Sequence, residues 1–233
     1  TASGRVNLSG TGYGPDGELA VVGNGVLDGP LRSELERALT VGDRATNAVL
    51  QKRDDDWFVL GDPTEGALVV AARKAGLADD MLDSRFVRVG EIPFSSERKL
   101  MSTIHRDSER LEQVVVFVKG APDVLLARCT QEVLGEGTRP LNDERRADIL
   151  RLNDELAGEA LRTLGVAARM LPLGDFDAGK LGDHMERDLA FAGLIGMIDP
   201  PREEAKQAVA RAKAAGIRPL MITGDHPVTA AVI

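Results

Sequence analysis

The sequence predicts a mixed α/β (α+β) protein, in which an antiparallel sheet with flanking helices is followed by part of a Rossmann-like βα unit. Three observations support this fold class. Short apolar segments between residues 86 and 119 are separated by polar turns, which is typical of paired strands. Amphipathic segments long enough for helices lie on both sides of them. A continuous apolar run at 189–198 is followed by Asp-Pro-Pro-Arg and a further helix–strand pattern.

The first part of the chain is expected to contain turns, short strands and one helix. Residues 1–30 are rich in glycine and strand-like, and they include two Gly-x-Gly matches. Neither match has the third glycine of a dinucleotide-binding loop, because Pro15 and Asp28 stand at that offset. We therefore interpret both as turns. The segment 31–50 is predicted to be helical, with a break near 41–42.

A second helix is predicted from Pro63 to the glycine at position 76. Asp62 is a suitable N-cap, and proline is favoured at the first helical position. Glu65 stands at the third position, as in a capping box. Gly76 would end the helix.

The remaining elements alternate between strands and helices. Strands are predicted at 86–92, 100–105, 113–119 and 165–171, and helices at 121–129 and 143–164. The run 189–198 predicts a strand buried on both faces, which the two following prolines end. A helix at 203–215, capped by Gly216, and a second buried strand at 218–222 follow. We therefore predict two domains, 1–198 and 199–233.

The composition argues against several classes of protein. A net charge of −8 argues against nucleic acid or an anionic membrane surface as the main partner. The single cysteine, Cys129, excludes an intrachain disulfide, and the three histidines are too far apart to suggest a metal site. The longest apolar stretch is shorter than the ~20 residues that span a bilayer, and no signal-peptide pattern occurs. We expect a soluble, cytosolic, monomeric chain.

Two segments contain candidate binding residues around position 94 and position 119. Lys119 ends a predicted strand, and a lysine at such a position is usually just solvated. The alternative is that its ammonium faces an anion and that Gly120 lets a ligand approach the backbone. Phe94 lies in a polar stretch, with Arg98 and Lys99 just beyond it. It is either a core residue or a stacking surface for an aromatic base, a contact worth about 1–3 kcal/mol.

A third segment, Leu-Met-Ile-Thr-Gly-Asp at 220–225, follows the last predicted strand. Open α/β sheets bind ligands at the carboxyl ends of their strands. The hydroxyl of Thr223 and the backbone amide of Gly224 would donate to a phosphate there. The alternative is a simple turn in which Asp225 is an N-cap.

Taken in order, four segments resemble those of the P-type cation-transporting ATPases: Phe-Ser-Ser-Glu-Arg-Lys, Lys-Gly-Ala-Pro-Asp, Asp-Pro-Pro-Arg and Met-Ile-Thr-Gly-Asp. The residues at 11–19 and 61–68 are most similar to the calcium-pump-like P2 subgroup. The resemblance covers nearly the whole chain and is weakest at 20–55 and 130–155. It implies that 1–198 is the nucleotide-binding domain and that 199–233 is a hinge with part of the phosphorylation domain.

The resemblance also implies roles for single residues. Phe94 would stack on adenine and Glu65 would accept from its amino group, while Lys99 and Lys119 would line the pocket. Some calcium pumps have an arginine where Ser96 stands here, which removes one expected phosphate contact. The resemblance assigns the other ATP-binding positions to Arg98, Gly120, Arg162, Asp199, Arg202, Thr223, Gly224 and Asp225. Of these, Thr223 and Asp225 would position phosphate for catalysis.

The family's phosphoryl acceptor motif, Asp-Lys-Thr-Gly-Thr, does not occur in this sequence, and neither does Gly-Asp-Gly-x-Asn-Asp. We therefore expect a catalytically incomplete part of a longer pump, which binds ATP weakly with Mg²⁺ and has no metal ligands of its own. Its partners would be the remaining phosphorylation, actuator and transmembrane domains, at the cytoplasmic side of the cell membrane. Calcium is the expected cation, and Na⁺/K⁺, H⁺ and Mg²⁺ are alternatives.

Two other functions remain as alternatives at this point. A stand-alone phosphatase of the haloacid-dehalogenase type shares the Thr-Gly-Asp pattern, but the sequence lacks its nucleophilic aspartate motif. A non-catalytic nucleotide-sensing or partner-docking module is compatible with everything above.

Overall fold

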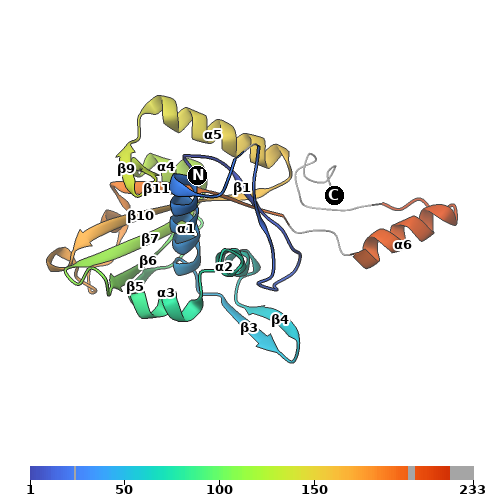
Figure 1. Cartoon of the computed structure of the whole chain (residues 1–233), viewed down its shortest axis with the longest axis horizontal. Helices are drawn as coiled ribbons and strands as arrows, with labels where there is room; N and C mark the ends of the chain where they lie inside the picture. The colour runs from blue at the N-terminus through green and yellow to red at the C-terminus, as the bar shows by residue number, and fades with distance from the viewer. Residues whose placement is uncertain (24, 199–202, 221–233) are drawn as a thin grey trace.

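The computed structural model describes residues 1–23, 25–198 and 203–220 (Figure 1). Its main feature is a seven-stranded sheet with the order β5-β6-β7-β10-β11-β8-β9. Neighbouring strands in this sheet are antiparallel, except for the parallel pair β11–β8. Two smaller sheets pair β1 with β2 and β3 with β4. The strands are β1 (Val6–Leu8), β2 (Leu19–Val21), β3 (Val49–Arg53), β4 (Asp56–Leu60), β5 (Phe86–Ile92), β6 (Leu100–Asp107), β7 (Gln113–Gly120), β8 (Cys129–Leu134), β9 (Gly137–Pro140), β10 (Arg162–Pro172) and β11 (Leu189–Met197).

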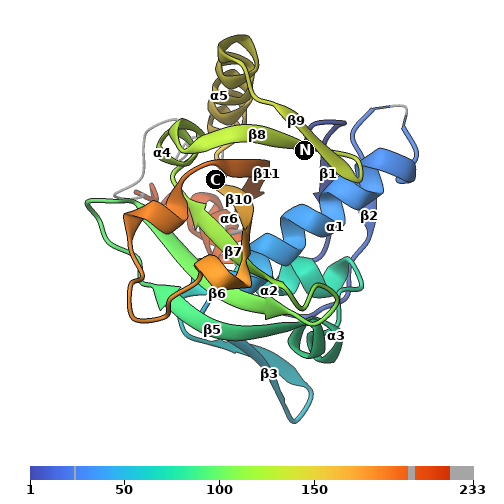
Figure 2. The ribbon, with the colours of Figure 1, turned by 90° about the vertical axis from the view of Figure 1, so that its left-hand side faces the viewer.

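Helices pack on the central sheet and against each other. α1 contacts β7, β10 and β11 and also packs against α2, whereas α4 and α5 contact β10. Figure 2 shows α1 crossing the curved sheet, with α4 and α5 near β8. The helices are α1 (Gly29–Arg44), α2 (Pro63–Lys74), α3 (Asp79–Arg85), α4 (Pro122–Ala127), α5 (Asp143–Gly158) and α6 (Glu203–Ala214), with 3₁₀ turns η1 (Leu173–Asp175) and η2 (Asp183–Glu186).

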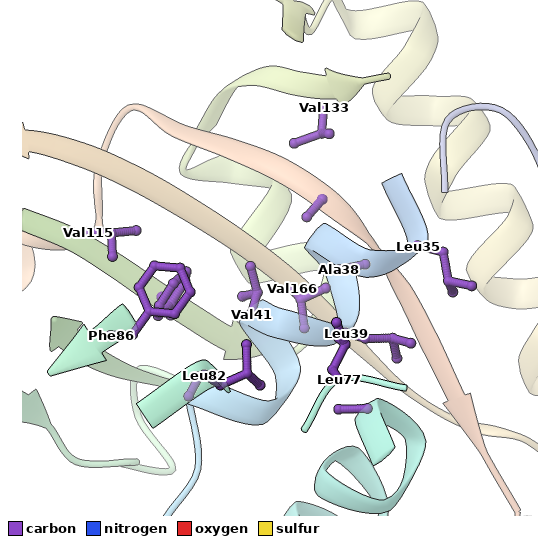
Figure 3. Packing of buried hydrophobic residues seen from close by; sticks show 14 residues of the cluster. Leu35, Ala38, Leu39, Val41, Leu77, Leu82, Phe86, Val115, Val133 and Val166 are labelled. Atoms are coloured by element: carbon purple, nitrogen blue, oxygen red, sulfur yellow. The ribbon is translucent and has the colours of Figure 1, made fainter. Parts of the chain in front are cut away.

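Strand β7 contributes to a separate hydrophobic cluster on each face of the sheet. Val115 and Phe117 belong to the cluster that includes α1, which Figure 3 shows, and Val114, Val116 and Val118 belong to the cluster that includes α4 and α5. This alternation follows from the two-residue repeat of a strand. Because both faces are buried, the strand is apolar from Val114 to Val118, and Lys119 follows.

The predicted α+β class and most predicted elements are confirmed. β5, β6 and β7 coincide with the three predicted strands to within two residues, and β1 and β2 lie in the strand-like first thirty residues. α2 begins at Pro63, where the Asp62 carboxylate accepts from the backbone N–H groups of Thr64 at 2.8 Å and Glu65 at 3.1 Å. Gly76, with φ +83°, follows the helix as expected.

The helix predicted at 31–50 is shorter, and it has no break near 41–42. α1 runs through both residues to Arg44, and β3 begins at Val49. The absence of a side chain at Gly42 instead lets α1 pack closely on its neighbours, because a Cβ there would lie 3.1 Å from Ile195 Cδ1 and 3.5 Å from Leu68 Cδ2. The sequence reading also missed the hairpin β3–β4, helix α3 and the hairpin β8–β9.

The prediction that 143–164 is one helix is wrong at its carboxyl end. α5 ends at Gly158, and Arg162 is the first residue of β10, paired with Met197. Ala160 adopts φ +61°, and the Leu161 N–H donates to the Leu156 carbonyl, which is how a helix commonly ends before an abrupt turn. Glycine usually occupies such a position, so Ala160 gave no signal in the sequence.

The predicted burial of the last two strands is only partly correct. β11 is buried at its start, but it pairs with β8 only over Leu189–Phe191, and beyond this point Gly196 and Ile198 are exposed. Residues 218–220 are not in a strand and Leu220 is 82% exposed, so a buried strand at 218–222 is wrong over that part. Residues 221 and 222 lie outside the described residues, and the Rossmann-like unit stays a prediction, as does the domain boundary at 198/199.

Candidate functional site

The sheet brings the candidate residues of three distant segments to one of its ends. Ile92, at the end of β5, pairs with Ser102, and Leu100, at the start of β6, pairs with Gly120 at the end of β7. Gly120 also pairs with Gly165, near the start of β10. The turn 93–99, the pair 119–120 and the beginning of β10 therefore meet at the same end of the sheet.

Lys119 forms an ion pair with Glu65 of α2. The Lys119 Nζ lies 2.6 Å from Glu65 Oε1, and Lys119 is only 7% exposed. The other oxygen, Oε2, accepts from the backbone N–H groups of Asn47 at 2.8 Å and Ala48 at 3.1 Å. The expected capping box is therefore absent, because the Glu65 side chain reaches the loop before β3 instead. Lys119 is not the ordinary solvated lysine that its position at a strand end suggested.

The charges around this pair have opposing effects on pKa. Burial lowers the pKa of Lys119, and the hydrogen bond to Glu65 and the charges of Glu65 and Asp62 only partly offset this. Burial opposes ionisation of Asp62, but hydrogen bonds from the backbone of Glu65 and Thr64 outweigh it, so the pKa of Asp62 is lowered. The positive charge of Arg162 adds to that lowering of the Asp62 pKa. The start of β10 and the start of α2 therefore interact electrostatically.

Phe94 and Lys99 are exposed on the turn between β5 and β6. Phe94 is 60% exposed, which excludes the alternative that it is a core residue. Lys99 has φ +54°, a left-handed conformation that costs a non-glycine residue about 1–2 kcal/mol. Its backbone is held on both sides: the N–H donates to Ser95 O at 2.7 Å, and the carbonyl accepts from the Ala121 N–H at 3.1 Å. Such strain in an exposed turn is often associated with function.

The neighbouring strand β6 leaves no room for a side chain at position 120, so a glycine is required there. A Cβ at this position would collide with the Lys99 carbonyl and lie 2.6 Å from Leu100 Cδ2. The expectation that Gly120 makes room for a ligand therefore has a structural alternative, because the space above its Cα is occupied by β6.

Arg98 points into the protein, unlike its neighbour Lys99. Its Nη1 donates to Glu186 Oε1 at 2.6 Å, and its Nη2 donates to the carbonyls of Pro93 and of Leu100, the latter at 3.3 Å. Arg162, in contrast, is exposed. The structure thus separates the two arginines that were both expected to bind ATP.

A polar network beside Glu65 was not anticipated from the sequence. The Asn47 side-chain amide donates to Glu91 Oε1 at 2.9 Å, and Arg88 pairs with Glu91 Oε2 at 2.9 Å and donates to the Thr46 carbonyl at 3.0 Å. These residues come from the α1–β3 loop and from β5. No spacing in the sequence relates them, and only the sheet brings them together.

Five predicted site residues cannot be placed in this arrangement. Asp199, Arg202, Thr223, Gly224 and Asp225 lie outside the described residues. Within the described residues, no three His, Cys, Asp or Glu side chains gather in a way that could hold a metal ion. Among the same residues, no helix is long and apolar enough to cross a membrane.

Two hollows in the described surface lie away from the candidate residues. A hollow of about 1010 Å³ is bordered by α1, α3 and the far ends of β6, β7 and β10, and one of about 400 Å³ by residues 1–8, α1, α5 and β11. Neither is lined by Phe94, Lys119 or Glu65. We base the candidate site on the converging side chains, because neither hollow is lined by them.

Comparisons with known proteins show the family of the chain. Residues 34–204 match the family model of the P-type ATPase, cytoplasmic domain N. Over 97% of its length the chain is 36% identical to a calcium-transporting ATPase of Bacillus subtilis, and over its whole length it is 39% identical to a probable cation-transporting ATPase F of Mycobacterium tuberculosis. Over 75% of its length it is 42% identical to a calcium-transporting ATPase of Listeria monocytogenes. The chain spans 25% of the first two relatives and 19% of the third. The chain therefore belongs to the P-type ATPase family, and residues 34–204 correspond to its cytoplasmic domain N.

Proposed function

We propose that this chain is the ATP-binding part of a membrane pump that couples ATP hydrolysis, through an aspartyl-phosphate, to the transport of a cation. The observation that carries the proposal is the convergence, at one end of the sheet, of an exposed aromatic ring, an ion-paired buried lysine and two exposed cations. These are Phe94, Lys119, Lys99 and Arg162. An aromatic face beside cations suits a planar base that carries phosphates.

Each side chain has a distinct task in this proposal. The free face of Phe94 stacks on adenine, and Lys119 lines the base pocket with its charge balanced by Glu65. The Glu65 carboxylate already accepts three hydrogen bonds out of about four that its lone pairs allow, so one remains for the adenine amino group. Lys99 lines the pocket beside the base, and Arg162 faces the phosphates.

Mg²⁺ would enter with the nucleotide, bound to its phosphate oxygens. The described residues offer no cluster of ligands for a metal ion of their own. In this proposal the described residues hold the base and supply a cation near the phosphates.

Phosphoryl transfer would need the segments beyond domain N. We propose that a hinge at 199–202, including Asp199 and Arg202, brings the γ-phosphate to an acceptor aspartate elsewhere in the pump. Thr223, Gly224 and Asp225 would position the transferring group and stabilise its charge. This part rests on the sequence resemblance alone.

We propose calcium as the cation, because two of the three relatives described above are named calcium-transporting ATPases. The partners of the chain would then be the remaining phosphorylation, actuator and transmembrane domains, and its place the cytoplasmic side of the cell membrane.

An ATP titration by calorimetry tests the proposal. We expect the wild-type chain to bind ATP, and Phe94→Ala to weaken binding by roughly 5- to 150-fold, the range that loss of one stacked base corresponds to. Lys119→Ala should also weaken it, because Glu65 then stands at the base pocket with an unbalanced charge.

Two variants serve as matched controls. Leu111→Ala removes a side chain that is 78% exposed in another turn, and Lys74→Ala removes a lysine whose ammonium donates to the carbonyls of Ser9 and Gly10. Both should bind ATP as the wild type does. Equal ATP affinity in Phe94→Ala, Lys119→Ala and the wild type would rule out this site.

A further inference from the structure

A buried carboxylate, Glu186, lies beside the turn that carries Phe94 and Lys99. Glu186 is 0% exposed, and its Oε1 accepts from Arg98 Nη1 and from Ser102 Oγ, each at 2.6 Å. A second cation, the Arg128 Nη1, lies 3.6 Å from the other oxygen. A carboxylate so fully removed from water is stable only with such partners.

Arg98 connects Glu186 to the backbone of the turn 93–99. Its Nη2 donates to the Pro93 carbonyl, just before Phe94, and at 3.3 Å to the Leu100 carbonyl, just after Lys99. The Arg98 backbone N–H also donates to Ser95 Oγ at 3.2 Å. One guanidinium therefore ties together the two ends of the turn, and Glu186 fixes the guanidinium.

Packing alone does not hold the two exposed groups in place. Phe94 is 60% exposed, and Lys99 is exposed as well. The directions of their side chains depend on the backbone of the turn. Whatever holds that backbone thus determines where the aromatic face and the ammonium lie.

We propose that Glu186 and Arg98 are positioning residues of the nucleotide site, acting through the turn 93–99 on adenine binding. The inference rests on the proposed function, and it changes the role of Arg98 from a direct contact with ATP, which a guanidinium would make through a phosphate, to a support of Phe94. If Arg98 turned outward to a phosphate, the partners left to the buried Glu186 charge among the described residues would be the Ser102 hydroxyl and the more distant Arg128. Breaking a buried pair in this way is strongly unfavourable.

The two roles considered for Arg98 predict different effects on the binding of nucleotides with one, two and three phosphates. A phosphate ligand contributes more to ATP than to AMP, whereas a support of the stacking ring contributes equally to AMP, ADP and ATP. Calorimetric titrations of the full chain with all three nucleotides therefore separate them. The variants are Arg98→Met, which keeps most of the apolar stem, and Glu186→Gln, which keeps the shape of the side chain.

We expect each variant to weaken the binding of AMP, ADP and ATP by the same factor, about tenfold. A misplaced Phe94 ring loses part of a stacking contact that changes the affinity by roughly 5- to 150-fold. The double variant should be no weaker than the stronger single variant, since both changes release the same turn. If Glu186→Gln does not fold, Ser102→Ala removes only the hydroxyl donor to Glu186 and should show a smaller loss with the same pattern.

Glu132 provides the matched control. It is 2% exposed and is paired with Arg139 at 2.7 Å and Arg145 at 2.8 Å, in strands β8 and β9 and helix α5. Glu132→Gln should lower the melting temperature as Glu186→Gln does, because it also disturbs a buried charge, but it should leave all three nucleotide affinities unchanged.

Three results would overturn the inference while leaving the proposed function in place. These are a loss in Arg98→Met that grows from AMP to ATP, additive losses in the double variant, or reduced melting temperatures with unchanged affinities. Absence of ATP binding to the wild-type chain would instead overturn the proposed function, and the inference with it.

Discussion

Lys99 combines an exposed charge with an unfavourable backbone conformation. Its φ of +54° is one that glycine adopts freely and that other residues adopt at a cost. The adjacent hydrogen bonds to Ser95 and Ala121 hold this conformation. A lysine at such a position is explained better by the charge it presents than by stability, and the two effects can be separated by substitution.

We expect Lys99→Gly to be more stable than Lys99→Ala by about 1 kcal/mol, because only alanine retains the cost of the left-handed conformation. Both variants should bind ATP equally weakly, since both lack the ammonium. Urea unfolding measures the first quantity and an ATP titration the second.

The same pair of substitutions at Lys180, which is exposed and has no positive φ, should give the opposite order, with glycine less stable. If alanine and glycine are equally stable at position 99, the strain assigned to this turn is absent in solution.

Helix α2 organises the site through its first turn. Asp62 caps it, and Glu65 extends from it to Lys119 and to the backbone of Asn47 and Ala48. The direction of the Glu65 side chain therefore depends on where the helix begins. A local capping interaction thus contributes to the geometry of a contact between residues 54 positions apart.

Asp62→Ala should lower the free energy of unfolding by about 1 kcal/mol, the usual cost of losing an N-cap. It should also weaken ATP binding, because the first turn that holds Glu65 would loosen. Urea unfolding and an ATP titration of the same preparation measure both effects.

Asn142→Ala is the corresponding change at α5, where the Asn142 side chain accepts from the Arg145 N–H at 2.9 Å. It should cost a similar free energy and leave ATP affinity unchanged. Unchanged ATP affinity in Asp62→Ala as well would mean that Glu65 keeps its place without the cap.

The stability of the whole molecule should depend on pH through a buried histidine. His105 is 3% exposed, and its Nδ1 lies 3.2 Å from the Phe86 carbonyl. Burial lowers its pKa to about 4, the hydrogen bond to the Phe86 carbonyl opposes this, and the charges of Arg44 and Arg88 add to the lowering. The neutral form is therefore the one that the folded protein accommodates.

Between pH 6.5 and about 4, the unfolded chain binds a proton at this histidine that the folded protein does not bind. The neutral His105 therefore makes its full contribution to the free energy of unfolding above pH 6.5, and this contribution is lost as the pH falls toward 4. The full difference corresponds to about 3 kcal/mol.

Urea unfolding between pH 7 and 4 measures this loss, which should be about 3 kcal/mol larger in the wild type than in His105→Gln. His184→Gln, a change at an exposed histidine, serves as the control and should follow the wild type. Parallel curves for the wild type and His105→Gln would show that His105 is not the titrating group.

Elements with local signals could be predicted from the sequence. Asp62, Pro63 and Gly76 delimit α2 because capping depends on neighbours within one turn. The strands β5, β6 and β7 follow from short apolar runs between polar turns. The order of the short motifs indicated the family, which the comparisons confirm. The burial of Lys119 and the end of α5 at Gly158 had no comparable signal.

The amino-acid sequence alone was sufficient for the fold class, for most of the elements and for the family, because each depends on residues close together or on motifs in a given order. The tertiary structure alone revealed that Lys119 pairs with Glu65 and that Arg98 binds Glu186, 88 residues away. It also placed Arg162 in a strand instead of a helix. These features depend on strand register and on side chains that meet across the sheet, and neither is encoded in any short stretch of sequence.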